Sequence, residues 1–311
     1  MYTLTTPPKI SVVIPVYNHA HRVVSAISSV LSQTYGNFEI VVVNDGSTDH
    51  LNEALQQFPD IRLIHHESNF GRAAARNTGV LAASGEYIAF LDADDQWKPT
   101  KLAKQIMFLE EKKDISICLT GYEVLMPNGN RRKVPFLNVQ HWERYLLKYN
   151  GLSDGSVPMI RKSCFEKVGL QDTALVWHEN WDWLLRAAGH SCKIGYIGER
   201  LSAKSKSQKH PPASLKEAGT VNLVKKHTLL FNTYGFYGRS AISLKWYNLS
   251  IDYFYEKKWQ KGVYYFFKAV RTWPLQRPGL YIRLLDALMG TNMEAFILNN
   301  IFYMNIKKMS R

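Results

Sequence analysis

The chain has few of the features that mark three common classes of protein. Its 311 residues include only three cysteines, Cys118, Cys164 and Cys192, which form no CxxC pair and no cysteine–histidine cluster. This excludes a disulfide framework and a zinc site, and it fits a reducing cytoplasm. No run approaches the roughly 18 apolar residues that a membrane-spanning helix requires. No basic segment followed by an apolar run opens the sequence, so we expect no signal peptide. These features predict a cytoplasmic protein, either free or peripheral at the cytoplasmic face of the membrane.

Two phosphate-binding motifs are also missing. No G-x-G-x-x-G follows the first predicted strand, and no G-x-x-x-x-G-K-[ST] occurs anywhere in the chain. A protein that binds a diphosphate without such a glycine-rich loop needs another way to neutralise the charge. A divalent cation held by carboxylate oxygens provides one.

Acidic residues are scarce in the C-terminal third. Residues 200–311 contain 19 Lys/Arg and 5 Asp/Glu, whereas residues 1–199 contain 20 and 21, so the net charge of +13 lies after residue 199. The chain from Thr228 onward also holds 19 of the 39 aromatic residues. This change predicts a first domain over residues 1–200, a mobile basic linker over 201–214, and a basic, aromatic-rich helical extension over 215–311.

The extension alternates lysines with aromatic clusters, for example Tyr264-Tyr265-Phe266-Phe267 followed by Lys268. Basic helices with aromatic borders suit an anionic membrane surface. A helical subdomain that packs its aromatic side chains against the first domain explains the pattern equally well. No nucleic-acid-binding motif accompanies the positive charge, so we expect no nucleic-acid partner.

Apolar runs of strand length alternate with helical patterns through the first domain. The expected strands are 10–16, 38–43, 61–65, 86–91, 115–120 and 193–196. The expected helices are 21–33, 48–58 with Ser47 or Thr48 as cap, 71–83, 97–111 and 181–188, with further helices over 215–272 and 278–309. This alternation is typical of an α/β fold with a mostly parallel sheet flanked by helices.

Polar clusters follow three of these strands: Tyr17-Asn18, Asn44-Asp45 and Asp92-Ala93-Asp94-Asp95. Ligands of open α/β sheets bind outside the carboxyl ends of the strands. If the three strands are parallel neighbours, the clusters meet in one crevice. Asp92 and Asp94 then suit a hard divalent cation, although a solvated acidic turn would have the same sequence.

Five motifs, in this order, resemble the family-2 glycosyltransferases: IPVYN at 14–18, VNDGSTD at 43–49, NFGRAAARNTG at 69–79, EYIAFLDADD at 86–95 and HENWDWLLRA at 178–187. They cover nearly all of residues 10–190. The resemblance implies a GT-A fold, a nucleotide-diphosphate sugar donor (a UDP-sugar above all), Mg²⁺ or Mn²⁺, and inversion at the anomeric carbon. It also implies a glycan or polyprenyl-linked acceptor in bacterial surface polysaccharide or glycoconjugate synthesis.

The resemblance also implies roles for single residues. Pro15 and Tyr17 would line the base pocket, Asp45 would accept a hydrogen bond from the base, Arg76 would lie beside the base and phosphates, Asp92 would bind the ribose or the sugar, and Asp94 would coordinate the metal. For Arg76 the alternative is a structural ion pair with Asp45 or Asp92.

The fifth motif departs from the family pattern at the general base. The family usually has an aspartate directly after the glutamate, but here that position is Asn180, whose amide cannot accept a proton. Three interpretations stay open: Glu179 is the base, Asp182 is the base, or the chain is catalytically weak and serves as a nucleotide-sugar binding or scaffold protein. We expect Arg186 to pair with an acid of its own helix.

Basic residues follow the first domain at Lys204, Lys206, Lys209 and His210. In the family this region can fold over the donor diphosphate, which predicts a lid formed by Lys206, Lys209 and His210. A solvated linker is the alternative.

Overall fold

A computed structural model of the chain describes residues 9–150, 155–206 and 211–274. The chain divides into two compact units. The first comprises Met1–Phe136, Asn150–Ala174 and Glu179–Gln208, and the second comprises Leu137–Tyr149, Leu175–His178 and Lys209–Arg311. The second unit therefore includes two short segments that precede residue 200 in the sequence.

The first unit is built on one sheet with the strand order β3-β2-β1-β4-β8-β6-β9-β5, and β7 pairs with β6. The strands are β1 Ile10–Val16, β2 Phe38–Asn44, β3 Arg62–His65, β4 Tyr87–Phe90, β5 Gln96–Trp97, β6 Ile115–Leu125, β7 Arg131–Lys133, β8 Met159–Arg161 and β9 Lys193–Ser205. Strands β3, β2, β1 and β4 run parallel, as do β6 and β9, while β8, β7 and β5 pair antiparallel with their neighbours. The predicted α/β fold with a mostly parallel sheet is confirmed.

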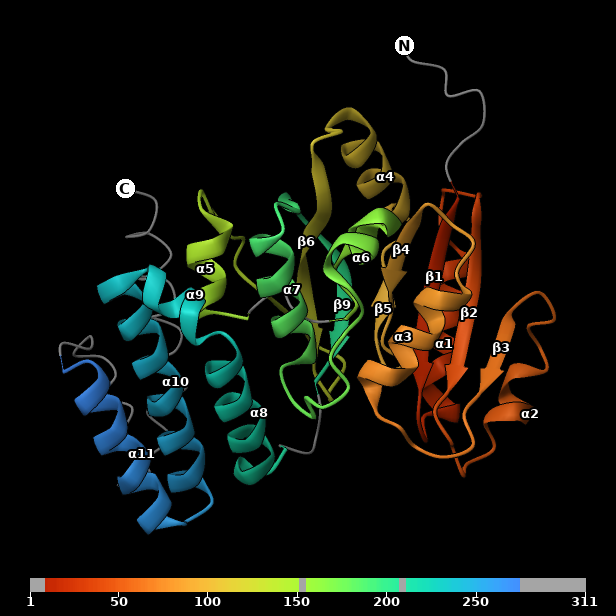
Figure 1. The fold of residues 1–311 in the computed structure, drawn as a ribbon. Helices are drawn as coiled ribbons and strands as arrows, with labels where there is room; N and C mark the ends of the chain where they lie inside the picture. Colours follow the sequence, from red (N-terminus) through yellow and green to blue (C-terminus); the bar gives the residue numbers. More distant parts are fainter. Residues whose placement is uncertain (1–8, 151–154, 207–210, 275–311) are drawn as a thin grey trace. The chain divides into compact units, whose positions relative to one another are not determined.

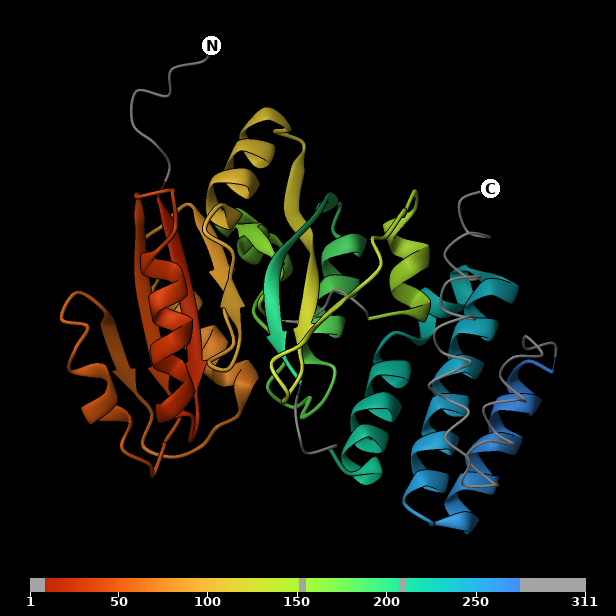
Figure 2. The same cartoon turned by 180° about the vertical axis from the view of Figure 1, so that it is seen from behind.

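Helices cover both faces of this sheet (Figures 1 and 2). The helices α1 Ala20–Leu31, α2 Leu51–Leu55 and α4 Lys101–Glu111 share one apolar core with alternate strand residues such as Val12 and Ala89. The helices α3 Arg72–Ala82, α6 Lys162–Val168 and α7 Glu179–Gly189 lie on the other face. There Gly79 of α3 approaches Val13, and Phe165 of α6 contacts both Phe90 and Trp183. The alternation of side chains along β1 and β4 thus supplies both cores.

Two sequence predictions near the site are wrong. The helix expected over 97–111 begins at Lys101, because Gln96 and Trp97 instead pair with β9 as strand β5. The helix expected after Ser47 and Thr48 begins at Leu51 without a side-chain cap. The two hydroxyl residues bind Asn18 of a neighbouring loop, so they are not available to the helix.

The strand expected over 193–196 continues as β9 to Ser205, because it keeps its pairing with β6. It therefore occupies the first five residues of the segment predicted as a linker, including Lys204.

The second unit is helical, which confirms a helical C-terminal region. Its helices are α5 Trp142–Lys148, α8 Ala213–Lys226, α9 Thr228–Thr233, α10 Gly235–Tyr255 and α11 Trp259–Thr272. Tyr265 of α11 stacks on Trp246 and Tyr253 of α10 in their shared core. The helix predicted over 278–309 lies outside the described residues. Within the described ranges, no helix combines the length and the apolar character that crossing a bilayer demands.

Candidate functional site

The three polar clusters leave the sheet at the same edge. Strand β1 lies between β2 and β4 and is parallel to both, with Val16 opposite Asn44 and Val13 opposite Phe90. The loops that follow these strands therefore start side by side, as predicted from the sequence. This edge is where open α/β sheets bind their ligands.

Hydrogen bonds tie the loop after β1 to the loop after β2. Asn18 has a positive φ of 54°, which brings its side-chain oxygen within 2.8 Å of the backbone nitrogen of Thr48. The backbone N–H of Asn18 donates to the Ser47 hydroxyl at 3.1 Å. Asparagine tolerates this left-handed conformation better than most residues. Next to it, Pro15 is buried in β1 and the Tyr17 side chain is 44% exposed, so Tyr17 is accessible to a ligand at this edge.

Asp45 holds the chain that leads into α3. Its buried carboxylate accepts hydrogen bonds from the backbone N–H of Phe70 at 3.0 Å and of Gly71 at 2.9 Å. The imidazole of His66 lies 2.7 Å from the same carboxylate. Gly71 has a φ of 91°, a conformation that favours glycine. Asp45 therefore shapes the loop that positions the start of α3.

Arg76 is the largest fully buried side chain among the described residues. Its Nη2 lies 2.7 Å from Asp92 Oδ1. Its Nη1 lies 3.3 Å from Glu179 Oε1 and 3.1 Å from Asn180 Oδ1. One guanidinium thus joins α3, the acidic loop after β4 and the first turn of α7. Of the two ion pairs considered from the sequence, the one with Asp92 is present.

Electrostatics within this cluster keep both partners charged. Burial alone would raise the pKa of Asp92, but the charge and hydrogen bond of Arg76 lower it below its usual value. Burial disfavours the charged guanidinium, yet Asp92 and Glu179 raise the pKa of Arg76. Arg72 adds a second cation, since its Nε lies 3.5 Å from Glu179 Oε1. Glu179 therefore lies between two guanidinium groups.

The three aspartates after β4 have different surroundings. Asp95 is buried, and its carboxylate accepts hydrogen bonds from the Ser156 hydroxyl at 2.6 Å and the Ser205 backbone at 2.9 Å. Burial, with the nearby charge of Asp92, raises the pKa of Asp95 to about 8. Asp94 keeps 27% of its side chain exposed, and its nearest cation is Arg22 at 3.6 Å. The loop therefore has one enclosed acid, Asp95, and two acids that are partly exposed: Asp92 at 26%, paired with Arg76, and Asp94 at 27%, near Arg22.

Asp94 fits the metal role that the resemblance implies. Burial, followed by the charge of Asp92, raises the pKa of Asp94, and a bound cation would relieve both effects. No cluster of three or more His, Cys, Asp or Glu side chains suited to a metal occurs among the described residues. Mg²⁺ is often held by one or two carboxylates together with substrate phosphates and water, so a single protein carboxylate is compatible with such an ion.

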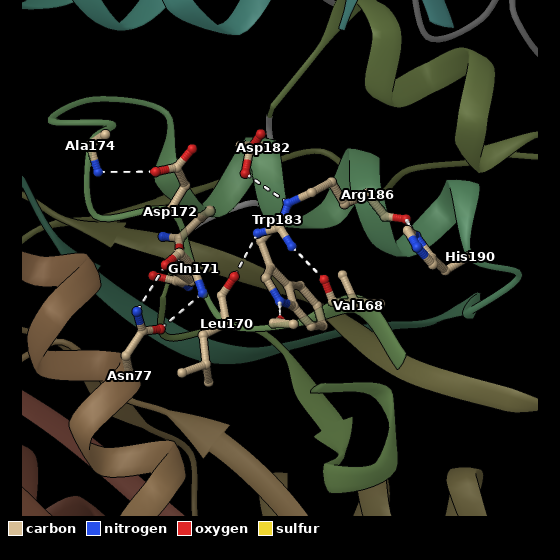
Figure 3. Close-up of polar contacts among 12 residues, drawn as sticks. Asn77, Val168, Leu170, Gln171, Asp172, Ala174, Asp182, Trp183, Arg186 and His190 are labelled. Atoms are coloured by element: carbon tan, nitrogen blue, oxygen red, sulfur yellow. Dashed lines mark hydrogen bonds and ion pairs between the residues drawn. The ribbon is translucent and has the colours of Figure 1, made fainter. Parts of the chain in front are cut away.

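Asp182 lies deep in the α7 packing. It has no exposed surface, and its carboxylate lies 3.0 Å from Arg186 Nε one turn later, which confirms the expected pairing of Arg186. The other guanidinium nitrogens of Arg186 donate to the backbone oxygens of Val168 at 2.6 Å and Leu170 at 2.7 Å. Figure 3 shows these contacts joining α7 to the segment after α6. The Asp182–Arg186 pair therefore anchors α7 against that segment.

The predicted lid is only partly described. Lys206 is exposed directly after β9, whereas Lys209 and His210 lie outside the described residues. Lys204 belongs to β9. Burial raises the pKa of both Asp92 and Asp95, and the positive charge of Lys204 opposes this effect.

The sequence did not single out several residues that build the site. Gly155 approaches the Arg76–Asp92 pair so closely that a Cβ atom would lie 2.5 Å from Asp92 Oδ1. The hydroxyl of Ser156 accepts from the Asp92 backbone and donates to Asp95. Both residues belong to a Gly/Ser-rich stretch that reads as an ordinary loop. The contacts of Gln171 have no signal in the sequence either.

Comparison with known proteins identifies the class of protein. The model of the family described as "Glycosyl transferase family 2" matches residues 11–168, which is half of the chain. The chain therefore belongs to glycosyl transferase family 2, and the resemblance drawn from its motifs is confirmed.

Curated relatives have similar N-terminal regions. The putative teichuronic acid biosynthesis glycosyltransferase TuaG of Bacillus subtilis is 38% identical over 126 residues, which cover 39% of this chain and 50% of TuaG. The "UDP-Glc:alpha-D-GlcNAc-diphosphoundecaprenol beta-1,3-glucosyltransferase WfgD" of Escherichia coli is 42% identical over 122 residues, which cover 39% of this chain and 48% of WfgD. An uncharacterized glycosyltransferase of Rickettsia bellii is 46% identical over 123 residues, 18% of its length. The chain thus spans half or less of the length of these relatives.

Solved structures share the fold. TarS of S. aureus, residues 1–349 in complex with UDP, superposes with a TM-score of 0.60 at 17% identity, covering 90% of this chain and 87% of that one. The same TarS segment in complex with UDP-GlcNAc gives the same TM-score. This likeness establishes the GT-A fold of the chain.

Proposed function

We propose that the chain is a glycosyltransferase that moves a sugar from a UDP-sugar to a glycan or lipid-linked acceptor in the synthesis of a bacterial surface polysaccharide or glycoconjugate. The observation that carries this proposal is the cluster around Arg76, which joins Asp92 after β4 to Glu179 of α7 at the edge where β1, β2 and β4 end. Family membership and the names of TuaG, WfgD and TarS support it.

The donor would bind across the three strand-end loops. Pro15 and Tyr17 would line the base pocket, and Asp45 would accept a hydrogen bond from the base. Asp92 would bind the ribose or the sugar in the orientation that Arg76 gives it. Asp94, partly exposed and with its pKa raised by burial, would hold Mg²⁺ or Mn²⁺. When bound, such an ion stabilises the charge that develops on the departing diphosphate.

The reaction would be a single displacement. The acceptor oxygen attacks the anomeric carbon on the face opposite the nucleoside diphosphate, the bond from that carbon to the phosphate oxygen breaks, and the acceptor proton passes to a carboxylate. We assign this role to Glu179, which touches the same guanidinium as Asp92. Asp182 pairs instead with Arg186 one turn along α7. Glu179 is also nearly buried, with 6% of its side chain exposed, but it shares the guanidinium of Arg76 with Asp92.

The second unit would meet an anionic membrane surface. The exposed apolar side chains at and within α11 are Trp259, Val263, Tyr264 and Phe267. Exposed basic residues flank them at Lys257, Lys258, Lys261 and Arg271. Apolar and aromatic groups bordered by cations suit the interface of a bilayer with anionic lipids, where each lysine or arginine contributes about 1 kcal/mol. A lipid-linked acceptor would be presented at such a surface.

The donor site is tested by UDP binding. We expect UDP at about 100 times its Kd to stabilise the chain by roughly 2.7 kcal/mol, with tighter binding in the presence of Mn²⁺. Asp94→Asn should lose the Mn²⁺-dependent part because the amide is a weak cation ligand, while Asp114→Asn, an exposed control, should keep it. Thermal shift and isothermal titration give both quantities. An unchanged Mn²⁺ effect in Asp94→Asn would contradict the metal assignment, and no UDP binding at all would contradict the proposed function.

The base is tested by comparing two carboxamide variants. Glu179→Gln should lower the rate of UDP release from UDP-glucose or UDP-N-acetylglucosamine by about 10²–10⁴-fold, the usual contribution of a general base. Asp182→Asn should chiefly lower the melting temperature, because it leaves Arg186 without its buried partner. A Glu179→Gln enzyme that keeps the wild-type rate would show that the proton goes elsewhere.

Membrane association is tested by sedimentation with vesicles. The full chain should pellet with phosphatidylglycerol vesicles and stay in solution with phosphatidylcholine vesicles. Replacing both Tyr264 and Phe267 by serine should weaken that binding several-fold, whereas Leu81→Ser, which removes an exposed leucine of α3, should not. Equal vesicle binding by the wild-type chain, the double variant and Leu81→Ser would show that Tyr264 and Phe267 do not contact the membrane. So would a double variant that changes oligomeric state while the wild-type chain binds no vesicles.

A further inference from the structure

Asn180 stands where the family usually has its catalytic aspartate, and the structure fixes which way its amide points. The carbonyl oxygen Oδ1 accepts two hydrogen bonds, from Arg76 Nη1 at 3.1 Å and from Gln171 Nε2 at 2.7 Å. A guanidinium has only N–H donors, so the group of Asn180 that faces Arg76 must be the oxygen. The amide nitrogen Nδ2 therefore lies on the opposite side of the side chain.

Because Oδ1 already accepts two hydrogen bonds, the amide nitrogen Nδ2 is the group of Asn180 that can bind a ligand. Asn180 is half-buried. Its Nδ2 has no hydrogen-bond acceptor among the described residues, and it is not fully enclosed. Part of Nδ2 is therefore exposed to solvent. Glu179 Oε1 and Asn180 Oδ1 both contact Arg76 Nη1, so residue 180 lies next to the carboxylate assigned as base.

Gln171 is held in place for this contact. Its backbone N–H donates to Asn77 Oδ1 at 2.9 Å, and its backbone oxygen accepts from Asn77 Nδ2 at 2.8 Å, as Figure 3 shows. Its side chain is buried, and its Oε1 has no partner among the described residues. Turning the Gln171 amide would bring that oxygen against Asn180 Oδ1. Two adjacent residues of α3 therefore act on Asn180, Arg76 directly and Asn77 through Gln171.

We propose that Asn180 presents Nδ2 as a hydrogen-bond donor to the attacking oxygen of the acceptor, and that Gln171 is the positioning residue that fixes this orientation. The inference rests on the proposed function. The attacking hydroxyl accepts a hydrogen bond from Asn180, gives its proton to Glu179, and uses its remaining lone pair to form the bond to the anomeric carbon. The bond to the diphosphate breaks as this one forms.

The first experiment replaces the donor by an acceptor of the same shape. Asn180→Asp keeps one oxygen on Arg76 and Gln171 and puts the other where Nδ2 was, next to the attacking oxygen. With UDP-glucose or UDP-N-acetylglucosamine as donor and water as acceptor, UDP release should rise at least tenfold over wild type, while Asn180→Ala should give no rise. The Kd of UDP should be unchanged in both variants.

The gain should carry a pH signature that a purely structural role lacks. Among the described residues, the charged groups linked to residue 180 through Arg76 are Asp92 after β4 and Glu179 of α7, and Arg72 of α3 pairs with Glu179 in turn. The rate of Asn180→Asp should fall on the acid side as the new carboxylate is protonated. Adding Gln171→Leu removes an N–H donor to that carboxylate, which raises its pKa, so the acid limb should move to higher pH.

A double-mutant cycle of Gln171→Leu with Asn180→Ala tests the coupling of these two residues without the Asn180→Asp variant. Gln171→Leu should lower UDP release several-fold without changing the Kd of UDP, and it should have no further effect in Asn180→Ala, because it acts through Asn180. Normal UDP binding with no gain in Asn180→Asp would overturn the donor role. An unmoved acid limb, or additive effects in the cycle, would overturn the role of Gln171. If the wild-type chain did not bind UDP at all, the proposed function itself would be contradicted.

Discussion

The buried guanidinium of Arg76 is the interaction on which the rest of the site depends. It is fully enclosed, and its three partners come from two segments far apart in the sequence: Asp92 after β4, and Glu179 and Asn180 at the start of α7. Leaving a buried charge unpaired costs several kcal/mol, so the acidic loop and the α7 turn are held to one geometry. Gly155 is part of the same constraint, because any larger residue would collide with the Arg76–Asp92 pair.

Acids that look alike in the sequence have different partners and different exposure in the structure. Asp92 is paired with Arg76, and Asp95 is enclosed, with a pKa that burial and the charge of Asp92 raise to about 8. Asp94 is exposed to nearly the same extent as Asp92, 27% against 26%, but its nearest cation, Arg22, lies 3.6 Å away, so it is the less tightly paired of the two. On α7, Asp182 pairs with Arg186, whereas Glu179 pairs with Arg76. Glu179 is buried as well, so the partners of each acid, more than residue type or burial, separate structural acids from candidate functional ones.

Local patterns in the sequence predicted the parts of the fold that local physics controls. The buried strand Ile10–Val16 and the placement of Asp45 and Asp92 at strand ends follow from apolar runs and their boundaries. The start of α4 was missed because Trp97 pairs with β9, more than a hundred residues later. The contacts of Gln171 were missed for the same reason, since they depend on Asn77 and Asn180 meeting in three dimensions. Asn180 itself was identified as a departure, but its orientation required the structure.

The proposed donor site depends on one guanidinium. The most direct test is the titration of UDP with Mn²⁺ into Arg76→Met, at a temperature where circular dichroism shows the variant folded. Without Arg76, Asp92 loses the partner that orients it, and Glu179 keeps only Arg72 at 3.5 Å, which leaves excess negative charge beside the proposed diphosphate site. The account predicts an affinity for UDP at least about tenfold weaker than that of the wild-type chain, about 1.4 kcal/mol. A folded Arg76→Met chain that binds UDP with the wild-type Kd would contradict it.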